Sequence, residues 1–438
     1  MKTKAAKTLT CLLGVVLLGT GLWGGSAGAS ENILTMDLSL AIEKALASSE
    51  DLLIGQNNIR KSEAEYRREK SAIYPQINGT ASLSHYFEYP ASAAVNDYAA
   101  DLGVSVEQLL WSFGKVRAAI SAQDKYMEVS RSNTEATRQA VIYNTKVSYY
   151  SVLLAERSYE ILSQSLKNAQ ENRDILTERS STGRISRRDL IKAGADVAGR
   201  QPLINEAETM RHTALQAFRV VTGLDPQQQV VLTDVSDGRP EDVDGPQMFS
   251  LMESREPTLQ ALTKAVELQK DVVRVKQASF LPEISGFASW NHKGLDSSHR
   301  LNSSALDDYG VVGVKVLVPF WTGGFLRQDL QAARVDQENA ELTLQKTRES
   351  YALALDQALA AYRDLTKTLE ANEEAVRLSQ ESFELTQDFF KTGSATLTDL
   401  NDAELQLTQQ LLNRENTRYN IQVSLAKIEQ LTRTGQRP

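Results

Sequence analysis

Apolar side chains recur at alternating spacings of four and three residues through the second half of the chain, which is the pattern of a coiled-coil helix. The seam consists of Tyr351, Leu355, Ala358, Tyr362, Leu365, Leu369, Asn372, Val376, Ser379, Phe383, Thr386 and Phe390. Asn372 is its one amide, and a lone polar residue on a seam can fix the register of paired helices. Val152 to Leu176 follow the same spacing less cleanly. Because several seam residues are small, these helices are predicted to need neighbours along their whole length.

The two stretches that carry these seams are unusually long. Neither Lys115 to Thr182 nor Phe325 to Thr392 contains a glycine or a proline, and each covers 68 residues. A helix of that length is about 100 Å long at a rise of about 1.5 Å per residue. Helices of globular proteins average about 11–12 residues, so the pattern predicts rods instead of an ordinary globular domain.

Shorter segments alternate apolar and polar residues with a period of two, which predicts strands. The clearest run from Ile77 to Phe87, from Ile284 to Trp290 and from Val312 to Val318. Such segments are typical of outer-membrane barrel strands, and they also occur in solvent-facing hairpins. Lipid tolerates no open sheet edge, and the four predicted strands do not close a barrel. A barrel therefore requires strands from several chains.

The same motifs occur twice and in the same order. Residues 75–82 and 282–289 share the pattern Pro-x-Ile-x-Gly-x-Ala-Ser, at an offset of 207. The turn that begins Thr182-Gly183 returns as Thr392-Gly393, at an offset of 210. This order predicts a duplicated unit of two strands, a long helix and a second helix. A helical stretch, near 38–72 in one copy and 256–279 in the other, leads into each pair of strands.

These repeats and the local composition divide the chain into parts. Residues 1–29 are predicted to be a signal peptide, because Lys2, Lys4 and Lys7 precede a mostly apolar stretch that ends in small residues. The first repeat covers 30–223 and the second covers 257–438. The segment 224–256, which contains several prolines and glycines, connects them. The predicted fold is mainly α with a small β part.

Composition narrows the class of protein. The formal net charge of −8 argues against a nucleic-acid partner, which requires a basic surface. The single cysteine, Cys11, falls in the predicted signal peptide, so the exported chain is expected to have no disulfide. No later apolar run reaches the roughly 18 residues of a transmembrane helix. The four histidines are scattered and no catalytic motif occurs, so we expect no enzyme, no metal site and no cofactor.

At its predicted helix–strand junctions and turns, the chain resembles the TolC-type outer-membrane efflux family. The shared features are Pro75 with Ile77, Pro282 with Ile284, the segment Val318 to Gly324, and the two Thr-Gly…Asp-Leu turns. The resemblance implies a homotrimer in the outer membrane of a Gram-negative bacterium. Four strands per chain would form a shared 12-stranded β-barrel, which continues into a periplasmic α-helical coiled-coil barrel with the connector at its equator. It also implies a periplasmic adaptor and an inner-membrane pump as partners of a passive conduit.

Two other classes of protein remain as alternatives. An exported trimeric coiled-coil stalk or adhesin would also be acidic and long-helical, although two strand pairs at equivalent points of a duplication argue against it. A periplasmic adaptor has a single helical hairpin beside β-domains, which this pattern lacks. Drug, metal and secreted-protein cargo are all compatible with the sequence, the last through type I secretion.

The two turns after the long helices carry helix-capping residues. Ser186 precedes Asp189 by three residues, and Thr396 precedes Asp399 by the same spacing. In a capping box, the hydroxyl accepts a backbone N–H and the carboxylate reaches back to the capping residue. Gly183 and Gly393 stand where a helix ends in the left-handed conformation. The resemblance implies that these two tips dock the adaptor.

Asp402 is not explained by capping, because its counterpart in the first copy is Lys192. The resemblance implies that Asp399 and Asp402 line a constricted periplasmic entrance, where three copies would gather six carboxylates. Such a ring repels itself and attracts cations. A plain solvated carboxylate is the alternative for Asp402, and we favour the entrance.

The latch that closes the entrance in the resembled family is only partly present. It pairs a tyrosine, an arginine and an aspartate near the tip. Asp189 is retained here, but Phe390 occupies the tyrosine position and Ala395 the arginine position. Phe390 cannot donate a hydrogen bond and Ala395 cannot pair with an acid. Arg184, Arg187 and Arg188 on the other turn are candidates to substitute for the missing residues, although we favour a solvated basic turn. The sequence therefore leaves open how the entrance is held shut.

Overall fold

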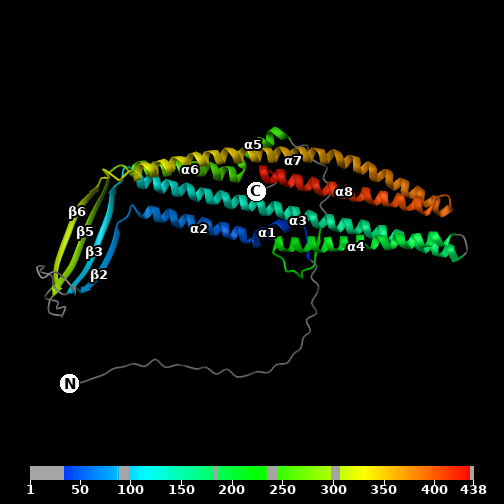
Figure 1. Cartoon of the computed structure of the whole chain (residues 1–438), viewed down its shortest axis with the longest axis horizontal. Helices are drawn as coiled ribbons and strands as arrows, with labels where there is room; N and C mark the ends of the chain where they lie inside the picture. The colour runs from blue at the N-terminus through cyan, green and yellow to red at the C-terminus, as the bar shows by residue number, and fades with distance from the viewer. Residues whose placement is uncertain are drawn as a thin grey trace, which may run out of the picture.

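The computed structural model describes residues 34–85, 87, 98–181, 185–233, 244–296 and 306–434. The predicted signal peptide, 1–29, lies outside them. Figure 1 shows an elongated chain with strands at one end and two helical hairpins pointing to the other. The fold is mainly helical with a small sheet, as the sequence pattern predicts.

The elements follow one another in a regular order. They are β1 (Leu34–Met36), α1 (Leu38–Ser48), α2 (Glu50–Ser71), β2 (Gln76–His85), β3 (Tyr98–Trp111), α3 (Lys115–Ser181), α4 (Arg187–Thr222), β4 (Val230–Leu232), α5 (Gly245–Arg255), α6 (Pro257–Ala278), β5 (Glu283–Asp296), β6 (Leu306–Leu317), α7 (Phe325–Thr392) and α8 (Leu397–Thr432). The succession α2-β2-β3-α3-α4 has the same order as α6-β5-β6-α7-α8. Corresponding helices also match in length, with 22 residues in α2 and α6, 67 and 68 in α3 and α7, and 36 in α4 and α8.

The strands form one antiparallel sheet in the order β2-β3-β5-β6. Its register pairs Val104 with Gly79 on one side and with Trp290 on the other, and Ala288 with Val312. The outer edges of β2 and β6 pair with no further strand within the described part of the chain. The sheet therefore ends in two open edges.

The helices form a layer that continues from the sheet. Beside the sheet, α2 packs on α3, α3 on α6 and α6 on α7. Toward the far end, α4 packs on α3, α3 on α8 and α8 on α7 (Figure 1). In both parts α7 lies at one edge of the layer. The opposite edge is α2 near the sheet and α4 near the hairpin tips.

Short elements pack against the long helices in the middle of the molecule (Figure 1). β1 pairs with β4 in parallel, Leu34 with Val230 and Met36 with Leu232. The fully buried Tyr149 of α3 packs beneath this pair and donates its hydroxyl to the backbone oxygen of Thr233 at 2.5 Å. This packing ties the start of the described chain and the segment after α4 to α3.

The structure differs from the sequence prediction in four local details. The predicted helix 38–72 is two helices, because Ser49 has an extended backbone and its side chain caps α2 by accepting the N–H of Leu52. The first strand is Gln76–His85, not 77–87. The predicted connector contains β4 and α5. The β1–β4 pair was not predicted, since strands of three residues carry too little periodicity to be recognised.

The predicted α7 seam is largely buried against α8. Leu355, Tyr362 and Phe383 are buried members of two apolar clusters. Asn372 donates from Nδ2 to the Thr417 hydroxyl of α8 at 2.9 Å, so the seam amide has a partner at one register. In the part of the chain that the structure describes, no helix is both long and apolar enough to cross a membrane.

Candidate functional site

The α7–α8 turn begins with Gly393 in the left-handed conformation, at a φ of 84°. Its N–H and that of Ser394 donate to backbone oxygens of the last turn of α7, the latter to Phe389 at 2.8 Å. This geometry favours glycine, because a Cβ is strained at positive φ. The equivalent Gly183 belongs to residues 182–184, which lie outside the described part of the chain.

Thr396 and Asp399 form a reciprocal capping box at the start of α8. The Thr396 hydroxyl oxygen accepts the N–H of Asp399 at 3.2 Å, and the Asp399 carboxylate accepts the N–H of Thr396 at 2.9 Å. The Thr396 hydroxyl also donates to that carboxylate at 2.7 Å. These hydrogen bonds, that of the hydroxyl first, lower the pKa of Asp399 because they favour its charged form.

The α3–α4 turn carries the matching cap at Ser186. Its hydroxyl oxygen accepts the N–H of Asp189 at 3.2 Å and donates to the Asp189 carboxylate at 2.7 Å. Asp189 is thus engaged with its own turn. Arg187 and Arg188 are exposed at the same tip, and Arg184 lies outside the described residues.

The first turns of α8 have two opposite faces. Leu397, Leu400 and Leu407 are buried, whereas Asp399 and Asp402 are exposed. The structure therefore brings the two acids to one exposed face of a single helix, one turn apart. A carboxylate pair in this position can attract cations and, where copies meet, repel its equivalents.

Phe390 and Ala395 lie near the tip but make no polar latch. Phe390 is buried in the apolar cluster that also contains Leu176 of α3, and Ala395 packs against this cluster. Arg179 of α3 lies over the Phe390 ring, with its Cζ 5.4 Å from the centroid. It also donates to the backbone oxygens of Phe390 and Lys391, at 3.3 and 3.0 Å. Phe390 thus takes part in a cation–π and backbone contact between the hairpins.

Two further polar contacts join the hairpins. Lys192 of α4 donates to the Thr398 hydroxyl of α8 at 2.7 Å. Deeper in the layer, Nη1 of Arg200 lies 2.9 Å from Oε2 of Glu404. Both side chains of this second pair are almost completely buried, at 5% and 1% exposed.

Arg200 has more than one partner. Its Nη2 lies 3.1 Å from the Asp196 carboxylate, one turn earlier on α4, and its Nη1 donates to the backbone oxygen of Ser165 on α3 at 3.0 Å. Burial raises the pKa of Glu404, and Arg200 opposes that rise. A single guanidinium therefore serves two carboxylates inside the helical layer.

The sequence prediction missed Arg179, Arg200 and Glu404. For the buried pair a signal was present, because both residues occupy seam positions at spacings of three and four. On α8 the seam reads Leu397, Leu400, Glu404, Leu407 and Leu411, and on α4 it reads Ala193, Val197, Arg200, Ile204 and Ala207. A charge at such a position indicates a buried partner. Arg179 carries no comparable signal.

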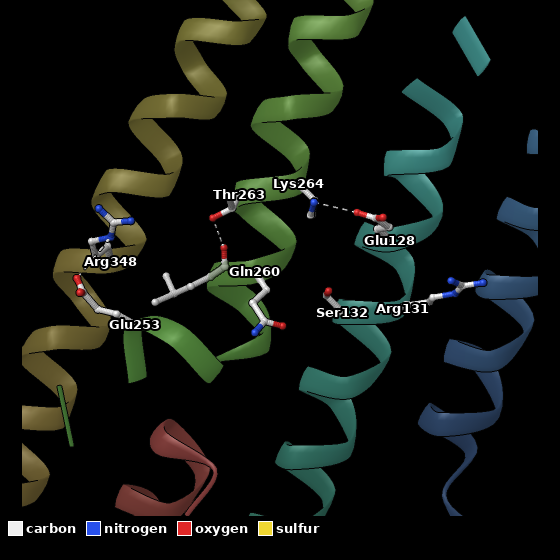
Figure 2. A pocket seen from close by; sticks show the side chains of 9 residues that line it. Glu128, Arg131, Ser132, Glu253, Gln260, Thr263, Lys264 and Arg348 are labelled. Atoms are coloured by element: carbon white, nitrogen blue, oxygen red, sulfur yellow. Dashed lines mark hydrogen bonds and ion pairs between the residues drawn. The ribbon is translucent and has the colours of Figure 1, made fainter. Parts of the chain in front are cut away.

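An open groove of about 500 Å³ lies far from the tips, between α3 and the helices α5 to α7. Figure 2 shows Lys264 of α6 pointing toward Glu128 of α3, with 3.1 Å between their charged atoms. Arg348 and Glu253 approach each other to 3.9 Å on its other side. Among the described residues, no group of three His, Cys, Asp or Glu is placed to hold a metal ion. Two contacts along the groove are thus ion pairs between neighbouring helices.

The sequence of the chain matches one protein family over most of its length. The sequence model of the family described as outer membrane efflux protein matches residues 41–224 and 248–433. The chain is 21% identical over 415 residues to the probable efflux pump outer membrane protein TtgC of Pseudomonas putida, with 89% of this chain and 82% of that protein covered. It is 21% identical over 430 residues to the outer membrane protein TolC of Escherichia coli, at 90% and 85% coverage.

Solved structures have the same fold. The Campylobacter jejuni CmeC outer membrane channel superposes with a TM-score of 0.79 at 19% identity, over 90% of this chain and 85% of that one. These relatives are channel proteins, and the stalk or adhesin alternative gains no support from them. The chain therefore belongs to the outer membrane efflux protein family, and it is an efflux channel of the Gram-negative outer membrane with a large periplasmic part.

Proposed function

We propose that three copies of the chain form one continuous conduit, with a shared 12-stranded barrel in the outer membrane and a coiled-coil barrel in the periplasm. The open edges of the sheet, at β2 and β6, carry this proposal. An unpaired strand edge is not tolerated in lipid, and pairing β6 of one copy with β2 of the next removes every edge. The order of the helices in the layer follows that of the strands, so the same ring closes the periplasmic part.

The exposed side of α7 supports this assembly. Six exposed apolar residues lie along it: Val335, Leu342, Leu353, Leu378, Leu385 and Phe389. An α-helix turns by about 100° per residue, so these six side chains leave the helix axis in directions that differ by no more than about 40°. An exposed apolar stripe of this length indicates a contact surface. Because α7 forms the edge of the layer in both its parts, the next copy is the partner that covers the stripe.

One strand of the sheet has an exposed apolar face that suits contact with lipid. Val312, Val314 and Val316 alternate along β6 and are all exposed. An alternating apolar face is the pattern of a membrane-spanning barrel strand.

The repeated order of strands and helices supports our proposal that each chain is a duplicated unit, with its repeats at 30–223 and 257–438 and the connector 224–256 at the equator.

The hairpin tips form the periplasmic entrance in this proposal. Asp399 and Asp402 face away from the buried side of α8, so three copies place six carboxylates around one axis. Ser186, Asp189 and Thr396 fix the starts of α4 and α8 through their caps. Gly183 and Gly393 mark the tips where a periplasmic adaptor docks, and an inner-membrane pump delivers the substrate through it.

The entrance is tested in planar bilayers with the full mature chain. Asp402→Ala removes half of the proposed ring of charge, so the preference of the channel for cations should fall. Glu374→Ala is the matched control, because it removes an exposed carboxylate from the side of α7, far from the tip. Unchanged selectivity in Asp402→Ala contradicts the entrance, and a monomer that stays soluble without detergent contradicts the trimeric conduit.

A further inference from the structure

A buried ion pair lies directly behind the proposed entrance. It consists of Arg200 on α4 and Glu404 on α8, and we call these two residues the clasp. Around it the contact between the hairpins is mainly apolar, with Leu400 and Leu407 of α8 and Ala193 of α4 in one cluster. Apolar contacts are non-directional. The clasp is therefore the contact in this region that depends most strongly on one alignment of α8.

A buried polar pair can specify register, because its partners meet in one arrangement only. The apolar α8 seam repeats every seven residues, so a shift along the helix replaces one leucine by another. No such replacement exists for Glu404, whose neighbours at that spacing, Leu397 and Leu411, carry no charge. A shift or rotation of α8 separates Glu404 from Arg200 while leaving much of the apolar contact intact.

The clasp also determines which way the entrance acids face. Asp402 is two residues from Glu404, which is about 200° around the helix, and Asp399 is about 140° away. Glu404 is buried, and both aspartates are exposed on the other side. Holding Glu404 against Arg200 therefore turns Asp399 and Asp402 away from the α3–α4 hairpin.

We propose that the arrangement in this structure is that of the closed channel, in which Arg200 and Glu404 act as a positioning pair that holds α8 on the α3–α4 hairpin and so keeps Asp399 and Asp402 at the entrance. This inference rests on the proposed entrance. It also supplies a contact between the hairpins in a chain where Phe390 and Ala395 provide no polar latch.

The two members of the clasp are not equivalent. Arg200 retains Asp196, 3.1 Å away, when Glu404 is removed. The groups that shift the pKa of Glu404 are Arg200 and Asp196 of α4 and the Asn168 amide of α3. Arg200 is the only cation among them. Removing Arg200 therefore leaves a buried carboxylate facing another acid. That charge is relieved only when α8 moves to admit water or when Glu404 takes up a proton.

The test measures the open fraction of single channels in planar bilayers at neutral pH. Arg200→Met should shift the ratio of open to closed channels by roughly a hundredfold, because an unpaired buried charge is strongly unfavourable. Adding Glu404→Gln to that variant removes the charge and should restore the closed channel. Arg377→Met is the matched control, since it breaks an exposed pair on α7 and should change nothing.

Acidification gives a readout that lost stability alone would not produce. The pKa of Glu404 is higher when the carboxyl is buried than when water reaches it, so proton binding favours the closed arrangement. The open fraction of Arg200→Met should therefore fall as the pH falls, and the variant that also carries Glu404→Gln should not respond in this way.

The outcomes separate the clasp from the entrance. If Asp402→Ala changes selectivity while Arg200→Met opens no more than the wild type, the clasp is wrong and the entrance stands. If Asp402→Ala changes nothing, the entrance itself fails. Should Arg200→Met not assemble, Glu404→Leu replaces it and should open more often than the wild type. A Glu404→Leu channel that stays closed like the wild type overturns the proposal.

Discussion

The α3–α4 and α7–α8 hairpins end in turns built from matching residues. Ser186 and Thr396 each cap the following helix through a hydrogen bond with an aspartate three residues later, and at Thr396 the backbone N–H completes a reciprocal box. Six residues after the cap the two turns differ, with Lys192 on α4 and Asp402 on α8. Lys192 contacts Thr398 of the other hairpin, whereas Asp402 is exposed on the far side of α8. Local structure thus accounts for what the turns share, and the proposed entrance accounts for how they differ.

The largest effect on ion selectivity is expected when Asp402 is replaced by lysine, the residue at the equivalent position of the first turn. Asp402→Lys leaves one acid and one lysine per chain at the proposed entrance, so the preference for cations should disappear. The capping box at Thr396 is untouched, and thermal unfolding should match that of the wild type. The ratio of cation to anion permeability in planar bilayers checks this prediction.

The converse change sharpens the comparison. Lys192→Asp gives the first turn the acid of the second, but Lys192 points toward Thr398 and not away from it. The variant should lose that contact without strengthening the preference for cations. A rise in cation selectivity equal to the fall in Asp402→Lys would show that both turns line the entrance alike.

The sequence predicts those features of the two hairpins that depend on residues close together in the chain. Helices α3 and α7 follow from long stretches without glycine or proline, and the caps follow from a hydroxyl three residues before an aspartate. Asn372 was identified as the polar member of the seam, although its partner Thr417 was not. Local patterns identify an element and the residues that end it.

The parts that were missed depend on residues far apart in the chain. Arg200 and Glu404 form an ion pair only after both hairpins fold and pack. The sequence around either residue does not identify its partner. Arg179 reaches Phe390 in the same way, across two hairpins. The β1–β4 pair joins Leu34 to Val230. A single sequence shows that a seam carries a charge, but the partner follows from the three-dimensional alignment.

The next effect concerns the glycine that ends α7. Gly393→Ala places a Cβ at a φ of 84°, which should lower the free energy of unfolding by about 1–2 kcal/mol. Among the described residues, chain neighbours aside, no atom lies within 4 Å of the added Cβ, so the loss comes from the backbone conformation and not from a clash. Thermal unfolding measures it. A variant as stable as the wild type would show that the turn relaxes without cost.

A smaller loss is expected from removing a cap. Thr396→Ala eliminates the hydroxyl of the reciprocal box and should cost about 1 kcal/mol of unfolding free energy. Ser186→Ala is the matched change in the other hairpin and should cost no more than that, because at Thr396 the backbone N–H also donates to the aspartate and completes a reciprocal box. Chemical denaturation of both variants ranks them. A clearly larger loss for Ser186→Ala would contradict the stronger cap that we assign to α8.

The smallest effect is a dependence on pH that belongs to the second turn. Hydrogen bonds from Thr396 hold the pKa of Asp399 below its ordinary value of 3.8 in the folded chain. A carboxyl with a lowered pKa stabilises the fold above the unfolded pKa, and this contribution is lost as the pH falls through the folded pKa. The stability difference between the wild type and Asp399→Asn should therefore shrink as the solution is acidified below the ordinary value. In the Thr396→Ala background the shrinkage should be smaller, since the hydroxyl that lowers the pKa most is gone. Thermal unfolding across this acidic range measures both, and a difference that stays constant with pH would place the stabilising role of Asp399 outside its charged cap.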